Sequence, residues 1–166
     1  MRIIILLICT ALSSKAYAVE ECDLHGSLEA DPLSISEPVK FQDIQGAKLI
    51  EVCTIAINKQ NGNLPRHHLL RARGYLSSGS YEEAKSDITY SHEMGYAAAT
   101  FALATLHHFG EGVPQDLLKA ATLYEQAYNE GVTWAARGLS ILYDDLSFDD
   151  YDPKLSKDWL YRFEGN

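Results

Sequence analysis

Apolar residues follow a helical pattern along much of the chain. Between Asp43 and Asn58 they recur at spacings of three and four, which predicts an amphipathic helix with Asp43 as its N-cap. Its apolar face consists of Ile44, Ala47, Ile50, Cys53, Ala56 and Ile57. From residue 64 onward, further amphipathic runs of about ten to fourteen residues alternate with turns, which predicts a series of paired helices.

The second half of the chain repeats itself. A shift of 36 residues superimposes glycine, alanine, leucine and aspartate positions without a gap. The matched pairs are Gly95 and Gly131, Ala99 and Ala135, Leu103 and Leu139, Leu106 and Leu142, Asp116 and Asp152, and Ala120 and Ser156. A recurrence of this length, with two amphipathic runs in each unit, predicts antiparallel helix pairs that stack on one another.

The turn FGEGVPQD at residues 109–116 separates the two runs of one unit. Gly110 and Gly112 can adopt positive φ, Pro114 stops the preceding helix, and Asp116 can cap the next one. A phosphate-binding loop is excluded because no Lys-Ser or Lys-Thr pair adjoins the glycines and no strand precedes them. We therefore expect this turn to shape the chain and to carry no chemistry.

The first 18 residues, MRIIILLICTALSSKAYA, have the layout of a secretory signal. A basic residue precedes an apolar run, and a small-x-small end predicts cleavage after Ala18. The apolar run is too short for a bilayer, which needs about 20 residues, so no stable membrane insertion is expected. Lipidation of Cys9 is an alternative that the bulky Ile8 disfavours. The protein is therefore predicted to be exported to the periplasm, with secretion from the cell as the alternative.

Two cysteines, Cys22 and Cys53, lie beyond the predicted cleavage site. An even number of cysteines in an exported chain indicates a disulfide, which would pin the segment around Cys22 to the helix that carries Cys53. Two free buried thiols are the alternative. A metal site would need further ligands, and only His25 lies close by in the sequence.

Residues 95–131 read GYAAATFALATLHHFGEGVPQDLLKAATLYEQAYNEG. Their pattern resembles the Sel-one-like repeats, a family related to the tetratricopeptide repeats. The positions that agree are Gly95, Ala99, Leu103, Gly110, Gly112, Val113, Asp116, Lys119, Ala120, Tyr124, Ala127 and Gly131. Ala104 and His107 depart from the family's usual Gly and Tyr. The resemblance implies an α-solenoid that is mostly non-enzymatic and holds other proteins.

The neighbouring segments resemble related repeats less closely. Residues 131–166 keep Tyr143 and Asp152, but DDLSFDDYD replaces the glycine turn. Residues 64–94 look more like a plain tetratricopeptide repeat, with Gly74, Tyr81 and Ala84 in place. The Cys-Asp start, the VKFQDI segment and the helix with the second cysteine resemble an arrangement that precedes such repeats in exported bacterial proteins.

The predicted fold class is all-α: a short α-solenoid of stacked antiparallel helix pairs with an irregular, disulfide-pinned N-terminal arm. The predicted divisions are a signal peptide at 1–18, an arm with a capping helix at 19–63, and a repeat domain at 64–166. The arm is expected to be irregular because residues 19–42 lack periodicity and contain two prolines. The repeat domain divides into a tetratricopeptide-like unit, a Sel-one-like repeat and a degenerate repeat, at 64–94, 95–130 and 131–166.

The charge of the chain disfavours two classes of partner. The formal net charge is −9, and removal of the signal leaves 12 basic against 23 acidic residues, a net charge of −11. Such a chain repels phosphate backbones and anionic membrane surfaces unless it carries a strong basic patch. The one basic cluster, RHHLLRAR at residues 66–73, is short and half apolar. We therefore expect no nucleic acid partner.

The sequence lacks the residue patterns typical of enzymes. Adjacent histidines at 67–68 and 107–108 point about 100° apart on a helix, so neither pair converges on a metal. No HExxH, paired CxxC or GxSxG motif occurs. The acidic loop 144–152 lacks the central Gly and closing Glu of a calcium loop, so a solvated loop is expected and calcium binding is the alternative. No catalytic residue, metal or cofactor is predicted.

The remaining function is binding. The first helices of stacked pairs line a groove, and their outward positions predict a partner-facing stripe of Arg71, Tyr75, Phe101, Thr105, His108, Arg137 and Ser140. The predicted function is that of a protein–protein interaction module, a periplasmic adaptor or regulator with an unknown protein partner. Trp159, Leu160 and Phe163 predict an apolar C-terminal edge, for which a second copy of the chain is an alternative occupant.

Two other functions stay open. The first, an envelope hydrolase or β-lactam-binding protein, is implied by resemblance alone, because some cysteine-rich secreted proteins of this repeat family bind or cleave β-lactams. Those proteins carry a cysteine pair in each repeat, whereas residues 64–166 contain no cysteine. The second is a secreted factor that acts on a host.

Overall fold

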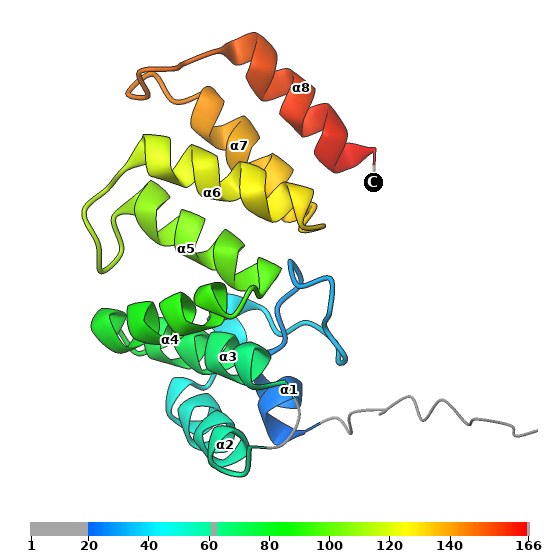
Figure 1. Cartoon of the computed structure of the whole chain (residues 1–166), viewed down its shortest axis with the longest axis vertical. Coiled ribbons are helices and arrows are strands. Elements are labelled where there is room, and N and C mark those ends of the chain that lie inside the picture. The colour runs from blue at the N-terminus through cyan, green and yellow to red at the C-terminus, as the bar shows by residue number, and fades with distance from the viewer. Residues whose placement is uncertain (1–19, 61–62, 166) are drawn as a thin grey trace, which may run out of the picture.

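The computed structural model describes residues 20–60 and 63–165. Within these residues the chain forms eight α-helices and one short 3₁₀ helix, with no strand. The helices are stacked along the long axis of the molecule, with α1 and α2 at one end and α8 at the other (Figure 1). Their bounds are α1 Glu21–Gly26, η1 Phe41–Asp43, α2 Gly46–Asn58, α3 Leu64–Ser77, α4 Tyr81–Glu93, α5 Ala97–Phe109, α6 Leu117–Asn129, α7 Trp134–Tyr143 and α8 Pro153–Glu164.

Consecutive helices pack as pairs. Helix α3 packs against α4, α5 against α6, and α7 against α8, while α4 meets α5 and α6 meets α7 between the pairs. Helix α2 covers the free side of α3. The predicted all-α fold, a short α-solenoid with a disulfide-pinned arm, is therefore confirmed. No helix in the described ranges combines the length and apolar character that crossing a bilayer requires.

The 36-residue recurrence corresponds to equivalent positions in the stack. Gly95 and Gly131 both follow the second helix of a pair and both have positive φ, at 76° and 99°. The residue after each glycine donates a hydrogen bond from its backbone N–H to a carbonyl five positions earlier, from Tyr96 to Ser91 at 3.1 Å and from Val132 to Ala127 at 2.9 Å. The two bends are therefore built in the same way.

The caps of α6 and α8 match as well. Asp116 and Asp152 share φ of −147° and accept hydrogen bonds from the first-turn backbone of their helices. Each also donates its own N–H to the end of the preceding helix, Asp116 to the His107 carbonyl at 2.9 Å and Asp152 to the Tyr143 carbonyl at 3.0 Å. These carbonyls are themselves 36 residues apart, so the recurrence extends to the backbone contacts that close each hairpin.

The turn at residues 109–116 has the predicted geometry. Gly110 ends α5 in the left-handed region, with φ of 71°, and Gly112 has φ of 68°. A Cβ at Gly112 would lie 2.8 Å from the Cβ of Tyr81, so the turn packs closely against the start of α4. A side chain here would be both strained and crowded, which explains the glycine without invoking chemistry.

The core of the stack is rich in alanine. Several alanines are fully buried, which allows neighbouring helices to approach closely; they include Ala72, Ala84, Ala99, Ala104, Ala120, Ala127, Ala135 and Ala136. Replacing Ala120 with leucine is expected to lower the free energy of unfolding by about 1–3 kcal/mol, because the tightly packed core has no room for three more carbons. Urea denaturation followed by circular dichroism measures this.

The exposed Gln126 on the same helix supplies the matched control for that substitution. Gln126→Leu should change the free energy of unfolding by less than about 0.5 kcal/mol, because it alters no buried contact. Equal effects of Ala120→Leu and Gln126→Leu would contradict the close packing of α6 against α5.

The N-terminal region differs from the prediction in three respects. Residues 19–42 are not wholly irregular, because Cys22 lies in the short helix α1. Asp43 belongs to η1 and is not the N-cap of α2, a position that Gln45 holds. The buried face of α2 is also rotated from the predicted one and consists of Leu49, Val52, Cys53 and Ala56. The predicted signal peptide at 1–18 lies outside the described residues.

The C-terminal pair agrees with the prediction only in part. Loop 144–152 is mostly exposed, as expected, but Phe148 is buried and its ring lies 5.5 Å from that of Tyr143. The predicted exposed edge of Trp159, Leu160 and Phe163 is wrong, because Trp159 is buried and the other two are half-buried. Trp159 is buried with its ring edge-on to Tyr128, and Phe163 packs against Trp134. Most positions on the outer side of α8 are polar instead, including Lys154, Lys157 and Asp158.

Candidate functional site

Residues 27–40, called the arm from here on, fold back onto the first helices of the pairs (Figure 1, blue). Arg73 on α3 donates hydrogen bonds to the backbone carbonyls of Gly26, of Ser27 at 2.6 Å and of Val39 at 2.8 Å. The two ends of this segment also meet each other, because the Val39 N–H donates to the Ser27 carbonyl at 2.9 Å. One arginine therefore fastens both ends of the arm to α3.

The middle of the arm is fastened to Tyr96, the N-cap residue of α5. The Tyr96 hydroxyl donates to a carboxylate oxygen of Asp31 at 2.6 Å, and the other oxygen accepts from the Leu33 N–H at 2.9 Å. Both side chains are buried. Burial raises the pKa of Asp31 and of Tyr96, and the adjacent carboxylate adds to the rise at the phenol. The arm is thus held at three points along its length.

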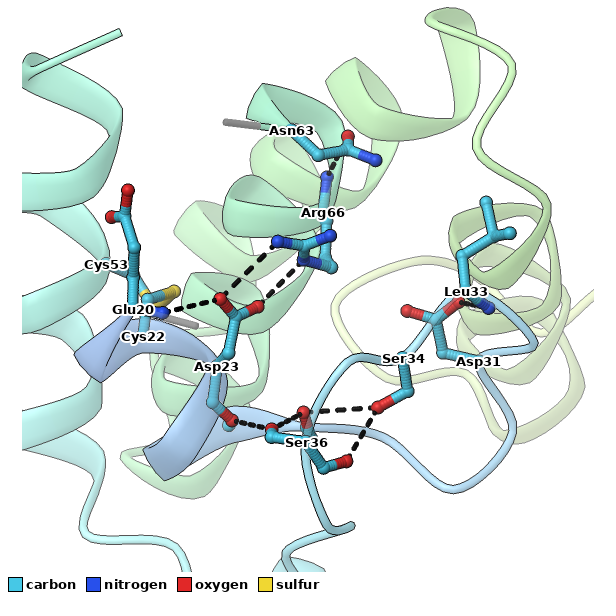
Figure 2. Close-up of polar contacts among 12 residues, drawn as sticks. Glu20, Cys22, Asp23, Asp31, Leu33, Ser34, Ser36, Cys53, Asn63 and Arg66 are labelled. Atoms are coloured by element: carbon cyan, nitrogen blue, oxygen red, sulfur yellow. Dashed lines mark hydrogen bonds and ion pairs between the residues drawn. A yellow bond between two sulfur atoms is a disulfide. The ribbon is translucent and has the colours of Figure 1, made fainter. Parts of the chain in front are cut away.

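A disulfide and an ion pair fix the base of the arm (Figure 2). Cys22 on α1 is bonded to Cys53 on α2, as predicted, and both residues are fully buried. The next residue, Asp23, accepts hydrogen bonds from Arg66 on α3, from Nε at 2.7 Å and from Nη2 at 3.4 Å. This ion pair is also buried. Helix α1 is therefore joined to both α2 and α3.

The arm and the first helices enclose two adjoining pockets. The α3–α5 pocket, of about 330 Å³, lies between those helices and is lined by Leu28, Phe41, Leu69, Ala72, Arg73, Leu76, Ile88, Phe101, Ala102, Thr105, Leu106, Phe109 and Glu111. The α7 pocket, of about 300 Å³, lies between the arm and the start of α7 and is lined by Leu28, Glu29, Ala30, Pro38, Val39, Lys40, Phe41, Arg73, Phe101 and Trp134. We call this surface, with both pockets, the arm face.

The two pockets share a wall. Leu28, Phe41, Arg73 and Phe101 border both of them. Phe41 is 53% exposed although it stands between two apolar hollows. An exposed aromatic ring beside preformed apolar pockets is typical of a binding surface.

No family model matches the chain, and no match to it was found among curated proteins. Function is therefore inferred from the residues and the geometry of the chain itself.

The predicted partner-facing residues do not form one stripe. Phe101 and Thr105 line the α3–α5 pocket. Arg137 is exposed on α7, with its guanidinium 5.7 Å from the centre of the Phe163 ring. His108 and Ser140 are buried, so the expectation that they face outward is wrong. Each is engaged within the stack, His108 with the Tyr124 hydroxyl at 3.2 Å and Ser140 with Ser156.

Arg71 and Tyr75 lie away from the arm face. Arg71 forms a bidentate ion pair with Asp87 on α4, with hydrogen bonds of 2.7 and 2.8 Å. It also donates a hydrogen bond to the Thr54 hydroxyl on α2 at 3.2 Å. The Tyr75 ring lies 5.8 Å from the same guanidinium. Neither residue lines a pocket of the arm face. Arg71 therefore joins three helices and is not an outward contact.

The Asp87 carboxylate also contacts His68 Nδ1 at 2.7 Å. Burial acts to raise the pKa of Asp87, but the hydrogen bonds from Arg71 and His68 outweigh it and the pKa is lowered. A histidine–aspartate pair can serve catalysis when a nucleophile adjoins the second ring nitrogen. No such hydroxyl or thiol contact with His68 is recorded among the described residues, and none of their acidic, histidine and cysteine clusters could hold a metal ion. The pair joins α3 to α4.

Sequence reasoning missed Leu28, Phe41, Arg73 and Trp134 as residues of the surface. The sequence did contain one signal for Phe41. It is a large apolar residue in a segment without helical periodicity, so no helix face was available to bury it. Arg73 lies in a helix that was predicted, but its partners come from the arm 34 to 47 residues away. That contact has no local signature.

His67 on α3 has an unusual environment. It is fully buried, and neither ring nitrogen has a hydrogen-bond partner in the part of the chain that the structure describes. Burial lowers the pKa of His67, opposed by the nearby Asp23 and reinforced by Arg66. Burial likewise lowers the pKa of His107 and of His108. The folded protein therefore favours the neutral forms of these histidines.

This environment predicts that stability falls in mild acid. The unfolded chain binds protons at its histidines near pH 6.5, whereas the folded chain resists them, so the free energy of unfolding decreases as pH falls below about 6.5. Each histidine contributes a slope of at most about 1.4 kcal/mol per pH unit. Urea denaturation at pH 7.5 and 5.5 measures the loss. His67→Leu should make it smaller, and an unchanged loss would contradict the role of His67.

Proposed function

We propose that the chain is an exported protein–protein interaction module of the Sel-one-like repeat type, a periplasmic adaptor or regulator that binds a partner protein on the arm face. The carrying observation is the pair of adjoining apolar pockets that share Phe41 and Phe101. Preformed hollows bordered by aromatic side chains are suited to the apolar side chains of a partner. Binding on this surface requires no covalent step.

Two further observations support the proposal. The equivalent bends at Gly95 and Gly131, and the equivalent caps at Asp116 and Asp152, are those expected of a repeated hairpin unit. The buried Cys22–Cys53 disulfide suits an oxidising compartment, as the periplasm is. Stacked repeats of this kind bury their core between neighbours and leave one long face free for a partner.

Site-specific photo-crosslinking tests this function. A photoreactive phenylalanine analogue at Phe41 should crosslink a specific protein in the periplasmic and envelope fractions. The same analogue at Leu118 on α6 is the matched control, because Leu118 is 55% exposed and lines neither pocket of the arm face. Phe41→Glu, added as the free protein, should compete for the partner less well than the unaltered protein does.

The outcome that overturns this proposal is also measurable. Equal crosslinking from the two positions, or none from Phe41, would remove the arm face as the site. Turnover of a cell-wall or β-lactam substrate by the purified protein, in the absence of a specific crosslink, would favour the hydrolase instead.

A further inference from the structure

Arg73 differs from the other two arginines of α3. Arg66 is paired with Asp23 and Arg71 with Asp87, whereas no carboxylate in the described ranges forms an ion pair with Arg73. Arg73 is only 7% exposed. Its partners are three backbone carbonyls, which are neutral. The structure therefore holds a buried positive charge that no negative charge balances.

The guanidinium of Arg73 also keeps free donors. Arginine has five N–H groups, and the three carbonyls use three of them. No acceptor among the described residues is recorded for Nε–H or for the second N–H of Nη2. Burial lowers the pKa of Arg73 to about 10, which leaves it charged at neutral pH. Burying a charge without a counter-charge is costly, so an anion that reaches these donors would be stabilised.

The α3–α5 pocket lies directly beside this charge. Its walls are mainly apolar, with Leu69, Leu76, Ile88, Phe101 and Leu106 among them. Its volume of about 330 Å³ is within the range of small-molecule sites, about 300–1,000 Å³. Glu111 lines the pocket as well, but it is exposed in the turn after α5 and forms no recorded ion pair with Arg73.

The few polar groups of the α3–α5 pocket argue against a peptide backbone buried inside it, whereas a partner protein on the arm face needs to insert only apolar side chains. The Thr105 hydroxyl already donates to the Phe101 carbonyl at 3.0 Å, and the remaining lining offers few hydrogen-bonding side chains. A peptide would bring backbone N–H and C=O groups that need partners. A fatty acid has one polar group, its carboxylate, and an apolar chain. This matches one cation without an ion-pair partner among the described residues, Arg73, beside an apolar pocket.

We propose that the α3–α5 pocket binds a small amphipathic carboxylate of the fatty-acid type, with its carboxylate on Arg73 and its acyl chain among the leucines and Phe101. This ligand goes beyond the proposed protein-binding function and does not depend on it. Because Phe41 and Phe101 border both pockets, an acyl ligand would change the surface that a protein partner meets.

Calorimetric titration of the purified, disulfide-bonded protein with decanoate and with 1-decanol below their aggregation limits tests the proposal. Decanoate should bind at one site, and 1-decanol should bind at least about tenfold more weakly, because the alcohol lacks the charge that Arg73 recognises. Equal affinities, or no binding of decanoate, would overturn the proposal. A tripeptide acetyl-Leu-Phe-Leu with a free carboxylate that binds more tightly than decanoate would also overturn it, in favour of a peptide.

Three variants locate the site. Ala102→Trp should fill the pocket without touching the Arg73 contacts and weaken decanoate binding by more than about tenfold. Thr122→Trp, at an exposed position of α6, should leave the affinity unchanged. Arg73→Gln should weaken decanoate binding at least about tenfold more than it weakens 1-decanol binding, because it removes the charge as well as the bonds to the arm, and equal losses for the two ligands would contradict the role of the charge.

The outcomes separate the two proposals. Unaltered decanoate binding in Ala102→Trp overturns the acyl site, even where Arg73→Gln fails to fold. The crosslink from Phe41 is read independently of the titration. A specific crosslink without decanoate binding rejects the ligand alone, and decanoate binding without a crosslink rejects the protein partner alone.

Discussion

Replacing Asp23 with asparagine is expected to lower the free energy of unfolding by about 3–5 kcal/mol, because it leaves Arg66 charged and buried without its partner. Asp23 also accepts the Glu20 N–H at 3.1 Å, which caps the first turn of α1. The substitution therefore weakens both the helix and its attachment to α3. Urea denaturation at pH 7 followed by circular dichroism measures the change.

Glu21 supplies the matched control on the same helix. Its carboxylate contacts His25 at 3.3 Å at an exposed position, so Glu21→Gln should cost less than about 1 kcal/mol. A double variant, Asp23→Asn with Arg66→Met, should be more stable than Asp23→Asn alone, since it removes the unpaired cation. A cost at Asp23 no larger than that at Glu21 would contradict the role of the buried pair.

Removal of the disulfide is expected to have a comparable effect. Cys22→Ser with Cys53→Ser should lower the free energy of unfolding by about 3–4 kcal/mol, because the bond closes a loop with a sequence separation of 31 residues. The effect arises mainly from the greater freedom of the unfolded chain. Denaturation in the absence of reductant compares the two proteins.

Reductant provides the control for this experiment. It should destabilise the unaltered protein by a similar amount and leave the double serine variant unchanged. Mass spectrometry without reductant should find Cys22 linked to Cys53. Two alkylatable thiols would show that the bond is absent from the folded protein.

The repeats were predictable because their signals are local. Helix pairs bury small and large apolar residues at fixed spacings, so a 36-residue shift of the sequence predicts the equivalent bends at Gly95 and Gly131. The same holds for the cap at Asp116, whose side chain accepts the Lys119 N–H at 2.9 Å. Each of these features depends on residues within about one turn of the position that reveals it.

The arm was not predictable for the opposite reason. Helix α1 has six residues, which is too short for a periodic pattern, and a reciprocal cap between Glu20 and Asp23 holds it together. The arm's attachment depends on contacts with Arg73 and Tyr96, which are far away in the sequence. Tertiary packing of this kind outweighs local preference.

The candidate site was predicted only in part. Phe101 and Thr105 were assigned to the binding surface and do line a pocket. His108 and Ser140 were assigned by the same reasoning and are buried, because each faces the second helix of its own pair, His108 toward Tyr124 on α6 and Ser140 toward Ser156 on α8. Helical spacing shows which residues share one face of a helix. It does not show whether another element packs on that face and buries it.

The matched caps at Asp116 and Asp152 make the length of this protein adjustable. Both close their hairpins through the same backbone contact, to His107 in one pair and to Tyr143 in the next. An in-frame duplication of residues 95–130 would therefore begin and end at equivalent positions and would add one further helix pair. The added pair would pack through the same contacts that already join neighbouring pairs, so the stack would lengthen without a new type of interface.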